Sequence, residues 1–343
     1  MKNIEIINLE NAANTPIVKD LRGLLNSLVV KDLRFICDLF NLSAMSNKPK
    51  KELVEAVYEQ LTTEEGLIKV IERFIDSEFD LFKKLLKNKG IIQDNFVSIN
   101  TYHYLYILGL VFLFKRENKF YISMTEDVFK IASNLDLDKF EPIIKDNSTT
   151  YWLLYSMINL YGVVSMDDLI DTYNQYYSKN EYSDIPLNAL YVTERMDSIL
   201  HIYTEDNSYF IKDILNIDQF EETFLDIINR QKQIDRKKIE LKKLLQYKDI
   251  SYYESTASIE KFKKYLNTKS SVDIVEEIIR NIISIFKLGN VPIAIILDML
   301  NDYNIKFNES EMQTILNYLM GIYNNTRIWP NNGWTPVEMR KNY

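Results

Sequence analysis

Apolar residues recur at intervals of three and four along most of the 343-residue chain, which is the spacing of one face of an α-helix. Signals of the Ser/Thr/Asn-x-x-Asp/Glu kind interrupt this pattern and mark expected helix starts. These signals occupy residues 62–65, 123–126, 165–168, 270–273 and 308–311. Alternating apolar runs, which favour strands, are short and few. The pattern therefore predicts a mainly α, multidomain fold with small β-hairpins.

The first predicted unit, residues 1–62, contains two helices joined by a polar extended loop. One helix begins near residue 30, the loop covers 41–48, and Pro49 stands at the first position of the second helix. The residues expected to face inward are Leu33, Ile36, Cys37, Phe40, Leu53, Val57 and Leu61. The segments VKDLRFIC at 30–37 and SNKPKKELV at 46–54, with Leu42, resemble the helix-extended loop-helix domains of the SAP and Rho-terminator N-terminal type. This resemblance implies a nucleic-acid-binding hairpin.

The second predicted unit, residues 63–147, combines helices with one β-hairpin. Helices are expected at 67–75, 79–86 and 100–108, with an extended stretch at 91–92. Two alternating apolar runs, 110–114 and 120–122, flank a polar turn at 116–118 and predict two strands. Helices followed by such a hairpin resemble a winged-helix module.

The third predicted unit, residues 148–228, repeats this order loosely. The segment YGVV at 161–164 mirrors KGII at 89–92, and the run at 208–211 mirrors the one at 119–122. We therefore expect a second winged-helix-like unit, with a longer insertion around residues 176–184.

The remaining residues, 229–343, begin within a long polar helix expected at 218–247 and continue into a helical bundle. The bundle helices are expected at 258–266, 273–288, 292–304 and 309–323. The segment 323–339 resembles a tail of bacterial proteins that often carry a C-terminal cysteine knuckle. The knuckle's cysteines are absent from this sequence, so the resemblance implies no metal site.

The placement of glycine, cysteine and histidine argues against several kinds of site. No two of the eight glycines stand closer than twelve positions. A dinucleotide-binding fingerprint and a P-loop both need clustered glycines, so the sequence contains neither motif. Cys37, His103 and His201 are far apart, so we expect no zinc. The 49 acids leave an all-carboxylate magnesium or calcium site formally open, but no EF-hand spacing appears, and we expect no metal and no cofactor. Cys37 falls on an apolar helix face, and both histidines are interpreted as structural. Without a catalytic motif, the protein is predicted not to be an enzyme.

Two features predict a cytoplasmic location. One Cys among 343 residues cannot form an intramolecular disulfide, which suits a reducing compartment. The first ten residues carry two acids and no apolar stretch of signal-peptide length, and the apolar stretch at 278–300 is interrupted by charged residues. We therefore expect neither export nor a membrane span.

Charge is distributed unevenly along the chain, whose net charge is −8. Residues 1–62 hold eight basic and eight acidic side chains, and residues 63–133 hold ten of each. Residues 148–228 hold three basic and fourteen acidic side chains, a net of −11, whereas 229–248 hold eight and two, a net of +6. Because phosphate is repelled by acidic surfaces and attracted by basic ones, only local basic clusters are expected to bind nucleic acid.

The candidate nucleic-acid-binding residues are therefore clustered lysines and arginines. They are Lys48, Lys50, Lys51, Lys115, Arg116, Lys119, Arg230, Lys232, Arg236, Lys237 and Lys243. On a helix, Lys232, Arg236 and Lys243 would form one ridge. Three other interpretations of this ridge are a solvated linker helix, a helix packed against the acidic unit and a contact with an acidic protein partner.

Together these patterns predict a non-enzymatic, DNA-associated regulator or adaptor of bacterial or phage origin. Its basic clusters would contact phosphates with little base readout, because the helix at 100–108 has almost no side chain suited to reading base edges. The alternative is a protein-interaction scaffold, in which winged-helix units and the acidic unit at 148–228 dock partners. An enzyme using dispersed carboxylates has no motif in its favour.

Overall fold

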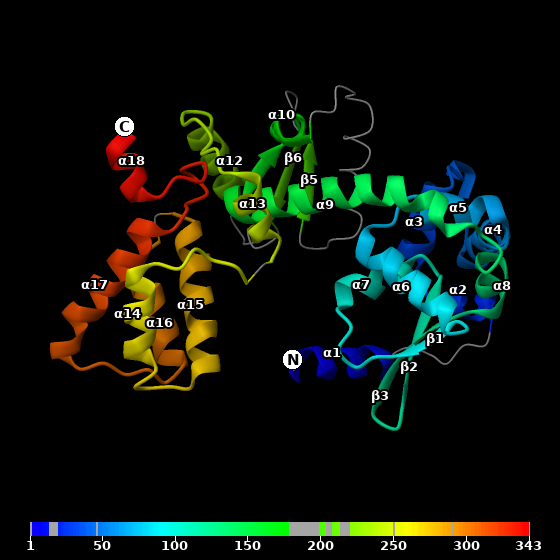
Figure 1. Cartoon of the computed structure of the whole chain (residues 1–343), viewed down its shortest axis with the longest axis horizontal. Coiled ribbons are helices and arrows are strands. Elements are labelled where there is room, and N and C mark those ends of the chain that lie inside the picture. The colour runs from blue at the N-terminus through cyan, green and yellow to red at the C-terminus, as the bar shows by residue number, and fades with distance from the viewer. Residues whose placement is uncertain are drawn as a thin grey trace. The chain divides into compact units, whose positions relative to one another are not determined.

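The computed structural model describes residues 2–13, 20–45, 47–177, 199–203, 208–212, 220–249, 251–289 and 291–342. It confirms a mainly α-helical fold with two small antiparallel sheets (Figure 1). The chain divides into two compact units, residues 1–151 and 152–343. We call them unit 1 and unit 2, and the finer division into four units stays a prediction.

Unit 1 consists of helices and one three-stranded sheet. In chain order it contains α1 (Lys2–Ala13), α2 (Leu21–Ser27), α3 (Val30–Leu39), α4 (Lys50–Leu61), α5 (Glu64–Ile71), α6 (Asp76–Lys87), β1 (Ile91–Gln93), α7 (Ile99–Ile107), β2 (Val111–Arg116), β3 (Lys119–Met124), α8 (Glu126–Ala132) and the first part of α9 (Glu141–Tyr161). The seven residues expected to face inward from the first predicted unit are all buried. They share one hydrophobic core with α5 to α8, and this core extends from Ala12 to Ile144. The predicted division after residue 62 therefore runs through a single core.

The predicted hairpin is confirmed in unit 1. The sheet order is β1-β3-β2, and both pairings are antiparallel. Two residues, Glu117 and Asn118, make the turn, and both have positive φ, 51° and 56°. This is the backbone of a two-residue type I′ turn, whose twist matches that of the flanking strands. The turn therefore sets the register of the hairpin, in which Arg116 stands opposite Lys119.

Unit 2 contains a second sheet and the helical bundle. After the end of α9 it contains β4 (Val163–Ser165), α10 (Met166–Tyr177), β5 (Ile199–Tyr203), β6 (Ser208–Lys212), α12 (Phe220–Gln231), α13 (Leu241–Leu244), α14 (Ala257–Leu266), α15 (Val272–Lys287), α16 (Ile293–Asp302), α17 (Glu309–Asn325) and α18 (Pro336–Asn342). The bundle of α14 to α17 confirms the four helices predicted there, and they bury one apolar core. The start predicted at 308–311 is a complete capping box, since Asn308 and Glu311 each accept a hydrogen bond from the other's backbone N–H.

The two sheets have the same strand order. The second sheet runs β4-β6-β5, again antiparallel throughout. The first strand of each sheet follows a glycine with positive φ, Gly90 at 84° and Gly162 at 77°. The sequence similarity of residues 89–92 and 119–122 to residues 161–164 and 208–211 thus corresponds to a repeated strand order. Of the insertion expected at 176–184, Tyr176 and Tyr177 end α10, and the rest lies outside the described residues.

The prediction of a single long helix at 218–247 is wrong. Helix α12 ends at Gln231, residues 235–240 are irregular, and α13 is one short turn. The C-terminal segment provides the hydrogen bonds that a continuing helix would have made: Lys237 N–H donates to the Asn332 carbonyl, and the Asn332 side chain donates to the Ile234 carbonyl. The apolar stripe of the sequence is also too sparse here to bury a helix face.

The C-terminal segment, residues 326–335, lies inside unit 2. Trp329 is only 2% exposed and belongs to a core cluster with β4, β6 and α12. Its ring lies against Gly162, where an added Cβ would come within 2.4 Å of it. Gln231 donates from its side chain to the carbonyls of Tyr161 and Trp329. The segment that resembles a tail in sequence is therefore part of the core.

Candidate nucleic-acid interface

The tip of the β2–β3 hairpin carries three of the candidate cations. Lys115, Arg116 and Lys119 are all exposed. Arg116 lies 3.9 Å from the carboxylate of Glu117, and both of these side chains are about three quarters exposed. An ion pair this exposed contributes little energy. The three cations are therefore available to an external anion.

One face of the same hairpin carries stacked aromatic rings. Phe114 stands opposite Tyr121, and their rings are parallel within 6° at a centroid distance of 4.9 Å. Phe112 lies two residues along the strand, and its ring stacks on Phe114 at 5.8 Å. All three side chains are half-buried. Because side chains alternate along a strand, Arg116 and Lys119 project from the same face as the rings.

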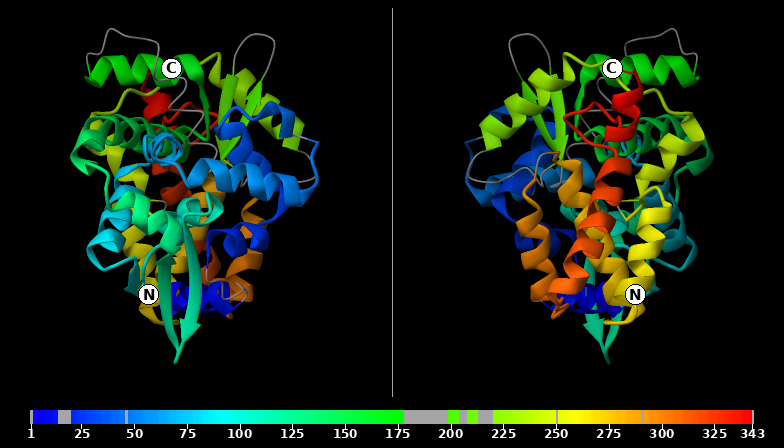
Figure 2. Two further views of the ribbon diagram at one scale, coloured as in Figure 1. Left: turned by 90° about the vertical axis from the view of Figure 1, so that its right-hand side faces the viewer. Right: turned by 90° about the vertical axis from the view of Figure 1, so that its left-hand side faces the viewer.

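The start of α4 carries the second predicted cluster of unit 1. Lys48 pairs with Glu52 at 3.1 Å, and Lys50 donates to the Asn26 carbonyl. Lys51 is exposed. The hairpin tip points away from α4 within unit 1 (Figures 1 and 2). The structure therefore places these lysines and the hairpin cations in two separate patches.

Helix α7 occupies the position between β1 and β2 where the winged-helix resemblance expects a recognition helix. Tyr102, Tyr104 and Leu105 are buried in the unit 1 core. Tyr102 donates from its hydroxyl to Asn8 of α1, which is itself fully buried. His103 is half-buried. Three of the nine residues of α7 thus face the core, and the other six are half-buried or exposed.

The basic segment at 230–248 does not form the expected ridge, because its members lie on different elements. Arg230 and Lys232 are exposed. Arg236 pairs with Asp168 at 2.7 Å, Lys237 with Glu338 at 3.5 Å and Lys243 with Glu254 at 3.0 Å. These three cations therefore neutralise acids of unit 2. Of these three acids only Asp168 lies in the acidic unit at 148–228, so packing against that unit describes Arg236 alone.

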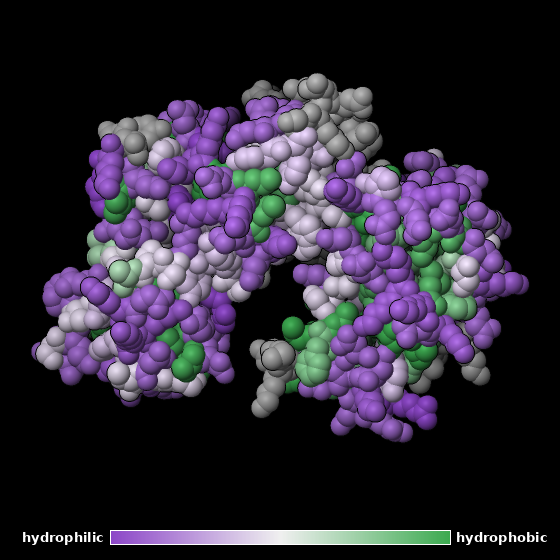
Figure 3. All heavy atoms as spheres, in the orientation of Figure 1, coloured by the Kyte–Doolittle hydropathy of each residue, from purple (hydrophilic) through white to green (hydrophobic). Residues whose placement is uncertain are grey.

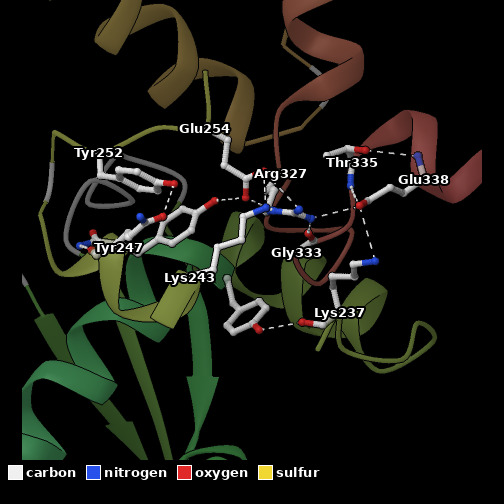
Figure 4. Close-up of polar contacts among 12 residues, drawn as sticks. Lys237, Lys243, Tyr247, Tyr252, Glu254, Arg327, Gly333, Thr335 and Glu338 are labelled. Atoms are coloured by element: carbon white, nitrogen blue, oxygen red, sulfur yellow. Dashed lines mark hydrogen bonds and ion pairs between the residues drawn. The ribbon is translucent and has the colours of Figure 1, made fainter. Parts of the chain in front are cut away.

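A buried arginine connects two of these pairs, Lys243–Glu254 and Lys237–Glu338 (Figure 4). The Arg327 side chain is 8% exposed, and its guanidinium donates to Glu254 at 2.6 and 3.3 Å. It also donates to Glu338 at 3.0 Å and to the Gly333 carbonyl at 3.0 Å. Glu254 accepts a further hydrogen bond from the Tyr247 hydroxyl at 2.8 Å. We call these residues, with Lys243 and Lys237, the Arg327 cluster.

Charge and burial act against each other in the Arg327 cluster. Burial alone would raise the pKa of Glu254, but hydrogen bonds and charge from Arg327, Lys243 and Tyr247 outweigh it and hold that pKa below its ordinary value. For Glu338, burial is likewise outweighed by the Thr335 N–H and the charges of Arg327 and Lys237. Both carboxylates are therefore stabilised in their ionised form.

We expect acid to remove this stabilisation. A carboxyl with a depressed native pKa contributes stability fully above its unfolded value, about 4.3 for Glu, and loses it as the pH falls through the native value. The difference in unfolding free energy between wild type and Glu254→Gln should therefore narrow below about pH 4. All three tryptophans lie in unit 2, so urea titrations followed by tryptophan fluorescence measure this difference in unfolding free energy.

The matched control is Glu260→Gln, which changes an exposed carboxylate on α14. The change should alter the unfolding free energy of unit 2 by no more than about 0.5 kcal/mol. A Glu254→Gln difference that stays constant down to about pH 3 would show that the Arg327 cluster does not stabilise unit 2 through ionised Glu254.

The sequence analysis names Lys237 and Lys243 but misses the other members of the Arg327 cluster. Glu254 lies 73 residues before Arg327, and Glu338 lies 11 residues after it on α18. No spacing rule connects them, because the cluster depends on tertiary packing. The one available signal is the unusual density of Asn, Trp and Gly at 324–334, which is uncommon in a solvated tail.

Two cavities of unit 2 border this cluster. One, of about 20 Å³, is lined by residues that include Tyr247, Lys287 and Arg327, and it has room for about one water molecule. The other is an open groove of about 530 Å³, lined by Asp235, Arg236, Lys237, Lys238 and Trp334. In the groove the Lys237 ammonium lies 4.0 Å from the centre of the Trp334 ring. Two of the groove's cations are already paired with acids.

The described residues hold no cluster of three or more metal-ligating side chains. Cys37 is buried in the unit 1 core, and burial raises the pKa of its thiol. The side chain of His201 lies outside the described part of the structure. Within the part of the chain that is described, no helix is long and apolar enough to cross a bilayer.

No protein-family model matches the chain, and no curated protein or solved structure matches it significantly.

Proposed function

We propose that this protein is a non-enzymatic, nucleic-acid-associated regulator or adaptor that binds phosphate through unit 1. The observation that carries the proposal is the β2–β3 hairpin, whose tip presents Lys115, Arg116 and Lys119 to solvent. Exposed cations on a projecting hairpin can approach a phosphate backbone with no larger loss than the exposed Arg116–Glu117 pair. Lys51, at the start of α4, offers a second contact.

The order of elements supports a winged-helix interpretation of this part of unit 1. Helices α5 and α6, strand β1 and helix α7 precede the β2–β3 hairpin, so helices followed by a hairpin are present as the resemblance expects. In this proposal the hairpin is the wing and contacts the backbone. Helix α7 contributes little to base reading, because Tyr102, Tyr104 and Leu105 pack inward.

Unit 2 has a different role in this proposal. Its candidate cations Arg236, Lys237 and Lys243 are paired with carboxylates, so we assign them to the stability of unit 2. A cation that binds phosphate must first give up such a partner, which reduces the net gain. Of this segment's candidates, only the exposed Arg230 and Lys232 keep the assignment to phosphate contact, in addition to the contacts of unit 1.

The proposal is tested by removing the hairpin charges together, in Lys115→Gln/Arg116→Gln/Lys119→Gln. Each phosphate contact adds about 0.9 to the dependence of log affinity on log salt for a duplex. The slope for a mixed-sequence duplex should therefore fall by about two to three units in the variant. Gel shifts or fluorescence anisotropy over a salt series measure the slope.

The matched control removes three exposed lysines elsewhere in unit 1, in Lys69→Gln/Lys130→Gln/Lys139→Gln. This variant has the same net charge as the test variant. Equal slopes for the two variants would mean that binding follows net charge and would contradict the assignment to the hairpin.

A complete lack of nucleic-acid binding at about 0.1 M salt would contradict the proposal as a whole. It would favour the alternative function, a protein-interaction scaffold. One observation favours that alternative: Ile4, Ile6 and Ile7 of α1 are 39%, 53% and 43% exposed. Figure 3 shows apolar surface at the position of α1. Exposed apolar patches of this kind are common at protein interfaces.

A further inference from the structure

The β2–β3 hairpin arranges cations and rings in rows on one sheet face. The outermost row is the cross-strand pair Arg116 and Lys119. The next row on the same face is Phe114 and Tyr121, two residues inward along each strand. Because strands rise about 3.3 Å per residue, the rows are about 7 Å apart. A polymer with alternating charged and planar groups therefore meets both kinds of partner on this face.

The rings form a continuous column. Phe112 stacks on Phe114, and Phe114 stacks on Tyr121. The opposite face of the sheet is occupied by the unit 1 core, where Leu113, Phe120 and Ile122 are almost fully buried. The half-buried rings are thus not needed to fill that core. Phe112 and Tyr121 end the column, and a further planar group can extend it at either end.

Nucleobases are planar groups joined to a phosphate backbone, and they stack on aromatic side chains whatever their sequence. In a duplex the faces of the bases already stack on one another, so an aromatic column has access to them only after unstacking. In a single strand they are accessible. The combination of a ring column and a cation pair on one face therefore fits a single strand better than a duplex.

We propose that this face of the hairpin binds single-stranded nucleic acid, with bases stacked on the ring column and phosphates held by Arg116 and Lys119. This inference rests on the proposed function and adds the form of nucleic acid that is bound. Stacking contacts the faces of the bases and not the sugar, so single-stranded DNA and RNA are bound alike.

The test is the full-length variant Phe114→Leu/Tyr121→Leu, which keeps apolar cross-strand neighbours but removes the rings. Fluorescence anisotropy is measured with one mixed-sequence oligonucleotide as single-stranded DNA, as single-stranded RNA and as duplex DNA. Wild type should bind both single strands more tightly than the duplex. The variant should lose about tenfold in affinity for single strands and little for the duplex, since stacking one base is worth about a tenfold change or more.

The ring control is Tyr318→Leu, which removes a half-buried ring from α17 in unit 2. It should leave all three affinities unchanged. Far-UV circular dichroism and the melting temperature of Phe114→Leu/Tyr121→Leu show whether the hairpin is intact. If the hairpin is disrupted, the single change Tyr121→Leu is measured in its place, with a loss of about threefold or more expected.

The outcomes separate this inference from the proposed function. If wild type prefers the duplex, or if the ring variant loses affinity equally for single strands and duplex, the stacking inference is wrong while phosphate binding stands. If removing the tip charges leaves the salt slope unchanged, the proposed function is wrong whatever the rings do. A preference for RNA over DNA of the same sequence would show that the sugar is read, which contradicts stacking alone.

Discussion

Replacing Arg327 with Met should destabilise unit 2 by about 3 kcal/mol. Methionine keeps an unbranched apolar stem in place of the arginine stem but leaves the carboxylates of Glu254 and Glu338 without their shared partner. Breaking a buried ion pair from one side costs more than the pair itself is worth, because the remaining charge stays in a poorly solvated place. Removing one partner of a buried ion pair usually costs about 3 to 5 kcal/mol. We expect a loss near the lower end of this range, since the side chains of Glu254 and Glu338 are 22% and 30% exposed.

Urea unfolding followed by tryptophan fluorescence measures this loss in the full-length protein. The control is Arg340→Met on α18, where an exposed arginine donates to Asn324 and a change within about 0.5 kcal/mol is expected. Arg327→Lys should lie between the two, because lysine keeps the charge but not the two-pronged contact with Glu254. A loss below about 1 kcal/mol for Arg327→Met would mean that the cluster contributes little to folding.

Gly162→Ala should cost about 4 kcal/mol of unfolding free energy in unit 2. Two effects add. Gly162 has a φ of +77°, a conformation that costs alanine about 1 to 3 kcal/mol. The new Cβ would also lie 2.4 to 2.7 Å from atoms of the buried Trp329 ring, which cannot move aside without disturbing the core.

Gly289→Ala separates strain from overlap. Gly289 lies in the same unit and has a φ of +99°, but the nearest atom to its added Cβ is 3.3 Å away. Gly289→Ala should therefore lose the unfolding free energy that backbone strain at positive φ costs, with little further loss from steric overlap. Equal losses for the two variants in the same fluorescence experiment would contradict the close packing of Trp329 on Gly162.

The parts of the fold that the sequence predicts are those set by local patterns. The helices of the bundle follow from apolar periodicity and capping residues such as Asn308 and Glu311. The hairpin follows from two alternating runs around Glu117 and Asn118, whose positive φ values make the turn. The candidate cations of the hairpin tip are predicted for the same reason, because a short turn leaves its neighbouring side chains exposed.

The parts that the sequence does not predict depend on contacts between distant segments. The helix expected at 218–247 stops at Gln231 because Asn332, about a hundred residues later, bonds to the backbone of the following residues. The same contacts turn Arg236 and Lys237 from an expected phosphate ridge into partners of Asp168 and Glu338. Charge counting along a chain cannot detect such pairing, since it depends on which segments meet after folding.

The burial of residues 326–335 has a consequence for how the chain reaches its native state. This segment follows most of unit 2 in the order of synthesis, yet it lies against Gly162 and bonds to Gln231. On the ribosome, unit 1 and the core of α14 to α17 can assemble before this segment is made, whereas the cluster of β4, β6 and α12 stays incomplete until Trp329 is available. Contacts between segments this far apart in the sequence form slowly. Until they form, the apolar residues of this cluster stay exposed, and exposed apolar surface favours chaperone binding and aggregation.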